Sequence, residues 1–561
     1  MQTRLRYIFL AVTLLTFTAM GPSFAAGGRD GRLMRFPLPP MGWGSWNSFS
    51  NTIDSKIVVS QAHAIISTGM LAAGYKYMLM DEGWWIGKRD SKGNISVDPR
   101  QWPALRPGEK PGDMRNIVRF LHRLGLKAGI YTDAGPFGCS FPYPDIGPHR
   151  PGTGSLGHYD QDMLRFAQQG FDYIKVDWCG GNAGNLDPAT QYTQIGRAVE
   201  RARAVTGHSL FFSICEWGNQ SPWTWAPGIA DMHGVMWRTG GDISWPIVDV
   251  PSEAGRRVSL QNVLNNFSAG IHPEAQHTGY YNDLDMMIVG MRGMSLSDDR
   301  VHMGLWAISG APLIVGADLT KLTKAQAAVL TNRDAVAIDQ DPMGVQCIQV
   351  GRGAPGLQVW AKPMAGAGVR AVVLLNRTPH AAPITVRWSG IGLRSQTQAF
   401  VKNVWSPRNS GMHTAAFTAT VPAHDADLLI VSGKAAAPLT YRSRVAPPVN
   451  DLRQSLAARC SGIYDAADHA VFRGISASRP STYIEIQYKN TGPHAIVARL
   501  AVNGQYVTRV QFPSTTAAPG GIGMVPLEVR FGNPGGTNEL RFASPCMNAL
   551  LNIRSVTVLP W

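Results

Sequence analysis

The stretch that decides the fold runs from residue 173 to residue 179 and reads Tyr-Ile-Lys-Val-Asp-Trp-Cys. It is a short apolar run that ends in Lys175 and Asp177. Because residues two apart on a strand point to the same side, these two charged side chains are expected to share one face. A neighbouring ammonium favours the ionised carboxylate, which is the form that a carboxylate nucleophile needs. The same pair is also typical of a buried ion pair that only fills a core.

Apolar runs on either side of this stretch alternate with helix-like segments, such as 113–124 and 159–169. The runs are almost continuously hydrophobic, as strands covered on both faces are. Strand–helix units repeated over about 300 residues favour a (β/α)8 TIM barrel over residues 33–345, an α/β fold. The runs that we interpret as strands are 75–80, 126–131, 171–176, 209–215 and 307–315. Carboxylates follow several of them, namely Asp81, Asp133, Asp177, Glu216 and Asp242, at the end where such barrels carry their catalytic residues.

The helical pattern stops after residue 345. Residues 346–432 contain short strand-like runs separated by Gly, Pro and Asn, which predicts an antiparallel β-sandwich. Residues 433–449 are rich in Ala, Pro and basic residues and are predicted to form a linker. Strand patterns return over 450–561, where Asn503-Gly504 between two alternating runs is a strong hairpin signal. This segment is expected to be a second, jelly-roll-like β-sandwich.

The first 25 residues have the features of a signal peptide. Arg4 and Arg6 precede a short apolar run, and Ser23-Phe24-Ala25 is a small-x-small cleavage signal. We therefore expect a protein that is secreted or periplasmic and does not span a membrane.

Composition narrows the function further. The chain has 561 residues, of which 44% are hydrophobic, 60 are Gly and 38 are Pro, a pattern that excludes a coiled coil and a wholly disordered chain. The formal net charge of +14 is scattered along the chain, which is more typical of a solvated surface than of a nucleic-acid site. No P-loop or dinucleotide fingerprint and no CxxC pair occurs, so neither a nucleotide nor a structural zinc ion is expected.

Two further strand ends carry polar groups suited to sugar chemistry. In the segment 237–242, Arg238 precedes a glycine pair and Asp242, a pattern that fits a proton donor beside a substrate-binding cation or, more plainly, a solvated loop. Asp81 and Glu82 precede Trp84 and Trp85, so this segment suits hydroxyl recognition with sugar stacking. A metal-binding or helix-capping role is the alternative for the two carboxylates.

Taken together, seven segments resemble glycoside hydrolase family 27, the family of α-galactosidases, α-N-acetylgalactosaminidases and β-L-arabinopyranosidases. They lie in the family's order between about residues 38 and 435. The segments are 39–47 (PPMGWGSWN), 75–84 (ending DEGW), 125–135 (GLKAGIYTDAG), 175–179 (KVDWC), 213–218 (SICEWG), 282–286 (NDLDM) and 337–344 (AIDQDPMG).

The resemblance implies a secreted, retaining exo-glycosidase that needs no cofactor and no metal. By position, Asp177 matches the family's nucleophile and Asp242 its general acid/base. The two carboxyl groups of a retaining pair lie about 5–5.5 Å apart, and the acid needs a higher pKa than the nucleophile. The family also implies a disulfide between Cys139 and Cys179, with Cys215 as a thiol of the pocket. The sugar-binding positions carry over onto Trp46, Asp81, Glu82, Tyr131, Lys175, Cys215, Arg238, Asp285 and Met286.

Glu82 departs from the family pattern, which has a second aspartate at this position. Its extra methylene is expected to crowd the 6-hydroxymethyl group of galactose and so to favour β-L-arabinopyranose, which lacks that group. Such an effect amounts to roughly 1–3 kcal/mol. The expected partner is thus an oligosaccharide or polysaccharide with galactose or arabinopyranose ends. An isomalto-dextranase-like glycanase and a catalytically silent sugar-binding protein are the alternatives. Leu284, where the family has Pro, places the Asp285 loop geometry in question.

The last domain resembles a carbohydrate-binding module of the family 35 or 6 type, on the residues 460–462, 502–504, 510–513 and 538–542. A sandwich that binds no sugar is the alternative. Whether Cys460 and Cys546 pair, and which oligomer the protein forms, does not follow from the sequence.

Overall fold

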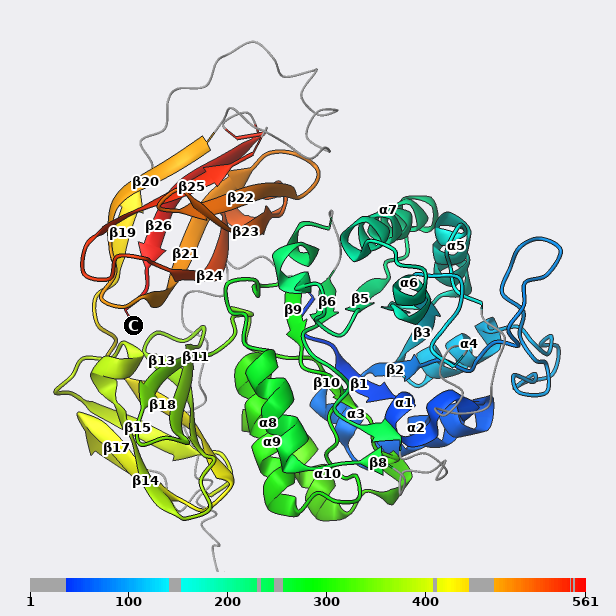
Figure 1. The fold of residues 1–561 in the computed structure, drawn as a ribbon, viewed down its shortest axis with the longest axis horizontal. Helices are drawn as coiled ribbons and strands as arrows, with labels where there is room; N and C mark the ends of the chain where they lie inside the picture. Colours follow the sequence, from blue (N-terminus) through cyan, green and yellow to red (C-terminus); the bar gives the residue numbers. More distant parts are fainter. Residues whose placement is uncertain are drawn as a thin grey trace, which may run out of the picture.

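The structure is a computed structural model that describes most of the chain. The described residues are 37–140, 153–229, 234–246, 256–406, 411–442, 469–544, 546–547 and 550–560. Figure 1 shows three domains in chain order, with the barrel on the right and the two β domains on the left. The predicted signal peptide of residues 1–25 lies outside the described residues.

Eight parallel strands form the sheet of the first domain. Its order is β10-β1-β2-β3-β4-β5-β6-β9, and a parallel bridge between Met287 and Val315 joins the two ends of this order. The strands are β1 (Met41–Gly44), β2 (Tyr77–Met80), β3 (Lys127–Asp133), β4 (Tyr173–Asp177), β5 (Phe211–Cys215), β6 (Val235–Arg238), β9 (Tyr280–Asp283) and β10 (Leu313–Val315). The prediction of a TIM-like α/β barrel followed by antiparallel β domains is confirmed.

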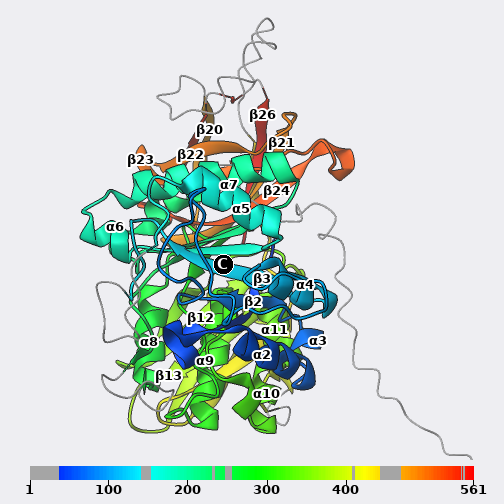
Figure 2. The same ribbon diagram turned by 90° about the vertical axis from the view of Figure 1, so that its right-hand side faces the viewer.

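Helices cover the outside of the barrel (Figures 1 and 2). They are α1 (Trp46–Phe49), α2 (Ser55–Ser67), α3 (Met70–Ala73), α4 (Arg115–Arg123), α5 (Tyr159–Gln169), α6 (Cys179–Ala183), α7 (Pro188–Thr206), α8 (Leu260–Ala269), α9 (Leu296–Ser309), α10 (Lys324–Leu330) and α11 (Arg333–Asp339). Between β5 and β6 the described residues form only the short 3-10 helices η3 (Pro222–Thr224) and η4 (Ala226–Gly228). A short antiparallel pair, β7 (Trp245–Pro246) and β8 (Arg256–Arg257), follows β6.

One predicted strand is wrong in its first part. Residues 307–309 belong to helix α9, which begins at a capping box formed by Ser295 and Asp298 and ends before Gly310, whose φ is 57°. Only Leu313–Val315 forms the strand β10. The prediction failed because a buried helix end and a buried strand are equally apolar, so hydrophobicity alone does not separate them.

The second domain consists of two antiparallel sheets. The larger has the order β11-β12-β13-β18-β15-β16, and β14 pairs with β17 in the smaller. The strands are β11 (Ile348–Arg352), β12 (Leu357–Pro363), β13 (Val369–Asn376), β14 (Ala382–Arg387), β15 (Gln398–Asn403), β16 (Gly411–Thr414), β17 (Ala416–Val421) and β18 (Asp425–Gly433).

The third domain packs two four-stranded antiparallel sheets against each other, in the orders β19-β26-β21-β24 and β20-β25-β22-β23. The strands are β19 (Leu439–Arg442), β20 (His469–Ser476), β21 (Ser481–Asn490), β22 (Ile496–Val502), β23 (Gln505–Phe512), β24 (Gly523–Arg530), β25 (Thr537–Ala543) and β26 (Leu551–Val558). At the predicted hairpin, Asn503 and Gly504 both have positive φ, 50° and 81°. The predicted linker is wrong over 439–442, because β19 pairs with β26 inside this domain.

The third domain contacts both other domains. Gln511 on β23 donates a hydrogen bond to the Ile229 carbonyl (3.5 Å), next to η4, where the barrel has no long helix between β5 and β6. Tyr483 on β21 is completely buried and packs into the core of the second domain, and its hydroxyl donates to the Gln346 carbonyl at 2.6 Å. The three domains therefore form one packed body. Among the residues that the structure describes, no helix is both long and apolar enough to cross a membrane.

Candidate active site

A lysine lies between two carboxylates at the carboxyl ends of β2 and β4. Lys175 Nζ is 2.8 Å from Oδ2 of Asp81 and 3.6 Å from Oδ2 of Asp177. Strand alternation places Lys175 and Asp177 on one face, as predicted, and the parallel register brings Asp81 beside them. The Asp177 carboxylate also accepts a hydrogen bond from the Trp178 N–H (3.0 Å), which fixes its orientation.

A second cation lies between two carboxylates at the ends of β6 and β9. Arg238 Nη2 is 3.1 Å from Oδ1 of Asp242 and 3.0 Å from Oδ2 of Asp285. The guanidinium is 5% exposed, so water screens these contacts little. Asp285 has a φ of 80°, a conformation that non-glycine residues adopt only where surrounding contacts hold it.

Both cations line one hollow at the mouth of the barrel. Its volume is about 410 Å³ when the part open to solvent is included. Asp177 is ion-paired with Lys175 on this wall, and Asp242 with Arg238, so the two carboxylates belong to one site. The predicted residues that line the hollow are Asp81, Lys175, Cys215, Arg238, Asp285 and Met286.

The electrostatics of Asp177 differ from the expectation of a low pKa. Burial raises the pKa of Asp177, the Lys175 ammonium lowers it, and the negative charges of Asp81 and Asp242 raise it again. The net direction is upward. The prediction counted only the lysine, whereas the cost of removing the carboxylate from water is the largest effect.

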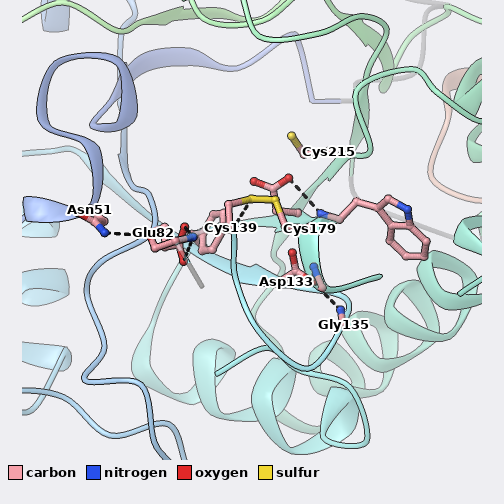
Figure 3. The surroundings of a disulfide bond; sticks show 12 residues. Asn51, Glu82, Asp133, Gly135, Cys139, Cys179 and Cys215 are labelled. Carbon is pink, nitrogen blue, oxygen red and sulfur yellow. Dashed lines mark hydrogen bonds between the residues drawn. A yellow bond between two sulfur atoms is a disulfide. The ribbon is translucent and has the colours of Figure 1, made fainter. Parts of the chain in front are cut away.

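Figure 3 shows the disulfide between Cys139 and Cys179, which confirms the predicted pairing. It links the loop after β3 to the start of α6, two residues beyond Asp177. Glu82 lies beneath it: both carboxylate oxygens accept from the Ser140 N–H, at 3.0 and 3.1 Å. The residue is only 2% exposed, and burial raises the pKa of Glu82 to about 8 against the opposing Ser140 hydrogen bonds.

Asp133, at the end of β3, is also buried beside the disulfide (Figure 3). It accepts hydrogen bonds from the N–H groups of Gly135 (2.6 Å) and Gly180 (3.1 Å). Burial, and after it the negative charge of Asp177, raise the pKa of Asp133 to about 8. This carboxyl therefore braces the backbone around Cys179.

The remaining predicted residues surround the hollow. Trp46 opens helix α1 directly after β1 and is half-buried. The ring of Tyr131 lies 5.2 Å from Lys175 Nζ, and its hydroxyl donates to Cys139 Sγ at 3.6 Å. The pairing of Cys460 with Cys546 stays a prediction, because Cys460 lies outside the described residues.

The predicted sugar-stacking role of Trp84 and Trp85 is wrong. Both side chains are buried, at 2% and 0% exposure, and the Trp84 indole donates to the Tyr131 carbonyl. They pack edge to face with ring centroids 5.4 Å apart. These tryptophans therefore support the wall of the site from behind.

Sequence reasoning missed two polar residues of the wall, Ser213 on β5 and Asp283 on β9. Each stands two residues before a residue that was predicted, Cys215 and Asp285. Strand alternation, which located Lys175 from Asp177, applied at the next two strands would have found both.

Comparison with known proteins agrees with this geometry. Residues 38–341 match the family model described as "Alpha galactosidase A", and residues 354–431 match "Alpha galactosidase C-terminal beta sandwich domain". Residues 469–552 match "Alpha-galactosidase, CBM13 domain", a carbohydrate-binding type different from the family 35 or 6 that we expected.

Individual relatives cover the first two thirds of the chain. An α-galactosidase of Coffea arabica is 35% identical over 394 residues, which are 70% of this chain and 93% of the relative. Alpha-galactosidase A of Cellvibrio japonicus is 35% identical over 406 residues, 70% of this chain and 92% of the relative. The crystal structure of α-galactosidase I from Mortierella vinacea has a TM-score of 0.60 at 30% identity and covers 71% of this chain and 98% of its own.

The match of the first family model spans more than half of the chain, and the carboxylate pairs lie at the mouth of its barrel. The chain therefore belongs to the α-galactosidases of glycoside hydrolase family 27.

Proposed function

We propose that this protein hydrolyses terminal α-D-galactosyl residues with retention of configuration, with Asp177 as nucleophile and Asp242 as general acid/base. One observation carries the proposal: two carboxylates from different strands are each ion-paired with a cation of one hollow. A retaining glycosidase needs two carboxyl groups that flank a single anomeric centre.

The proposed reaction has two displacements. In the first, an Asp177 oxygen forms a bond to the anomeric carbon while the bond to the leaving oxygen breaks, and Asp242 gives that oxygen its proton. In the second, Asp242 takes a proton from water, the water oxygen bonds to the anomeric carbon, and the bond to Asp177 breaks. Lys175 and Arg238 balance the charge that moves between the two carboxylates.

The proposed substrate class is a galactoside, because the relatives named above are α-galactosidases. The arabinopyranoside preference rested on Glu82 crowding the sugar. The hydrogen bonds between the Glu82 carboxyl and Ser140 give that group a partner in the protein itself, which weakens the crowding argument. We also propose that the protein is exported, on the strength of Arg4, Arg6 and the cleavage signal 23–25.

The test is a rate comparison on p-nitrophenyl α-D-galactoside, p-nitrophenyl β-L-arabinopyranoside and dextran, with proton NMR of the first-formed sugar. We expect the galactoside to react fastest and to release α-galactose first. Release of β-galactose would refute the retaining mechanism, and inactivity on all three substrates would favour a silent sugar-binding protein.

A further inference from the structure

The loop that carries Asp242 is held from behind by helix α8. Asn262 and Asn266 are four residues apart on this helix, so their side chains lie on the same face. Asn262 Nδ2 donates to the carbonyl of Ile243 at 2.8 Å, and Asn266 Nδ2 donates to the carbonyl of Gly241 at 3.0 Å. The two amides therefore grip the chain on both sides of Asp242.

Asn266 also reaches the neighbouring loop. Its Nδ2 donates a second hydrogen bond, at 3.1 Å, to the carbonyl of Leu284, which precedes Asp285. Asp285 in turn accepts from the Ile243 N–H at 2.7 Å and from Arg238 at 3.0 Å. One buried amide thus ties together the two loops whose carboxylates share the Arg238 guanidinium.

The loop needs such support because its own sequence provides little. Gly240 and Gly241 precede Asp242, and glycine has the greatest backbone freedom of any residue. The loop lies outside the regular strands, since β6 ends at Arg238. The Asp242 side chain is 21% exposed, so the contacts that orient it come from Arg238 and from the backbone that carries it.

We infer that Asn262 and Asn266 are positioning residues for Asp242, and that Asn266 sets the Asp242 and Asp285 loops relative to each other. The inference rests on the proposed role of Asp242 as general acid/base. A general acid works only within hydrogen-bond reach of the leaving oxygen, and a displacement of about 1 Å costs roughly 10²-fold in rate.

The test is a leaving-group series. kcat/KM is measured on aryl α-D-galactosides whose phenols range from acidic to weakly acidic, for wild type, Asn266→Ala, Asn262→Ala and Asp242→Asn. Poor leaving groups depend on protonation and good ones do not. We therefore expect Asn266→Ala to lose about 10- to 100-fold on the poorest leaving group and less than about 3-fold on the best. Asn262→Ala should show the same pattern at smaller size.

The matched control is Asn265→Ala. Asn265 lies on the exposed face of the same helix, where it accepts a hydrogen bond from Gln261, so it has no contact with the Asp242 loop to lose. It should match wild type across the whole series. Thermal unfolding of each variant measures how much stability is lost, and a purely structural loss lowers the rate on all substrates by one factor.

The outcomes separate the two claims. If Asp242→Asn shows the leaving-group pattern and both asparagine variants lose equally on all substrates or not at all, the positioning inference is wrong and the proposed function stands. If Asp242→Asn itself loses equally on all substrates, the acid/base assignment fails and the inference fails with it. Should Asn266→Ala not fold, Asn262→Ala decides the inference by the same criterion.

Discussion

Lys175 Nζ lies 3.6 Å from Oδ2 of Asp177, and the two residues are two positions apart on the same barrel strand. The ammonium stabilises the carboxylate, but burial and the neighbouring charges of Asp81 and Asp242 still raise the pKa of Asp177. A sugar bound in the hollow with a developing positive charge would add a second favourable partner. The site is therefore arranged to stabilise charge in the transition state more than in the free protein.

Replacing Asp177 tests the nucleophile. Asp177→Ala should abolish hydrolysis, lowering kcat by at least about 10⁴-fold, because no covalent glycosyl-enzyme can form. Added azide should restore turnover of an activated aryl galactoside by entering the vacated space. The azide attacks from the Asp177 side, so the product should be the β-galactosyl azide, identified by NMR.

Asp133→Asn is the matched control for this experiment. Asp133 is the register partner of Asp177 on the adjacent strand and is likewise buried, but it hydrogen-bonds to Gly135 and Gly180 and does not border the hollow. Since the pKa of Asp133 is raised to about 8, its neutral isostere should keep activity within about 10-fold at pH 6. Near-normal activity of Asp177→Ala without azide would eliminate the nucleophile assignment.

The sequence predicted the barrel and most of its wall because both depend on local periodicity. Continuous apolar runs mark strands buried on two faces, and alternation then places Lys175 with Asp177. What failed depends on long-range packing. The exposure of Trp84 and Trp85, the net pKa shift of Asp177 and the membership of β19 in the third domain each depend on neighbours distant in the sequence, which periodicity does not report.

The buried Glu82 carboxyl predicts a pH dependence of stability. In the unfolded chain the pKa of Glu82 is about 4.5, and in the folded protein burial raises it to about 8. Below pH 4.5 both states hold the proton. As the pH rises towards 8, only the unfolded state releases it, so the free energy of unfolding falls by up to about 1.4 kcal/mol per pH unit from this group. Glu82→Gln should remove that slope in urea denaturation between pH 5 and 7.5.

Glu539→Gln serves as the comparison variant. Hydrogen bonds from Arg473 and Arg541 lower the pKa of Glu539, so the stability it contributes is present above about pH 4.5 and is lost only below that value. Its replacement should leave the slope between pH 5 and 7.5 unchanged. A Glu82→Gln variant with the wild-type slope would show that Glu82 is already ionised in the folded protein.

The disulfide between Cys139 and Cys179 should contribute stability through the chain that it closes. The two cysteines are 40 residues apart, for which loss of the cross-link costs about 4 kcal/mol in the chain-entropy picture. Cys139→Ser alone and the double variant with Cys179→Ser should therefore lose the same amount in chemical denaturation. A double variant much less stable than the single one would mean that side-chain packing, and not the cross-link, is responsible.

Glu82 also offers a test of substrate choice. Glu82→Asp shortens the side chain by one methylene and withdraws its carboxyl from the Ser140 N–H. If the longer side chain crowds the 6-hydroxymethyl group, the ratio of kcat/KM for the α-galactoside over the β-L-arabinopyranoside should rise by roughly 10-fold. Glu82→Gln keeps the length and separates size from charge. An unchanged ratio in Glu82→Asp would dismiss crowding by this residue.

Tyr483 tests whether the third domain is a structural part of the enzyme. Its side chain lies in the core of the second domain, whereas Tyr488 on the same strand is buried in the core of the third. Each Tyr→Ala change removes a buried ring and should cost about 3–5 kcal/mol. If the domains unfold as one body, calorimetry should show one transition that moves down in both variants, and galactosidase activity should be lost at the same temperature. A separate third-domain transition that alone responds to Tyr488→Ala, with the activity midpoint unchanged, would instead identify the domain as an appended module.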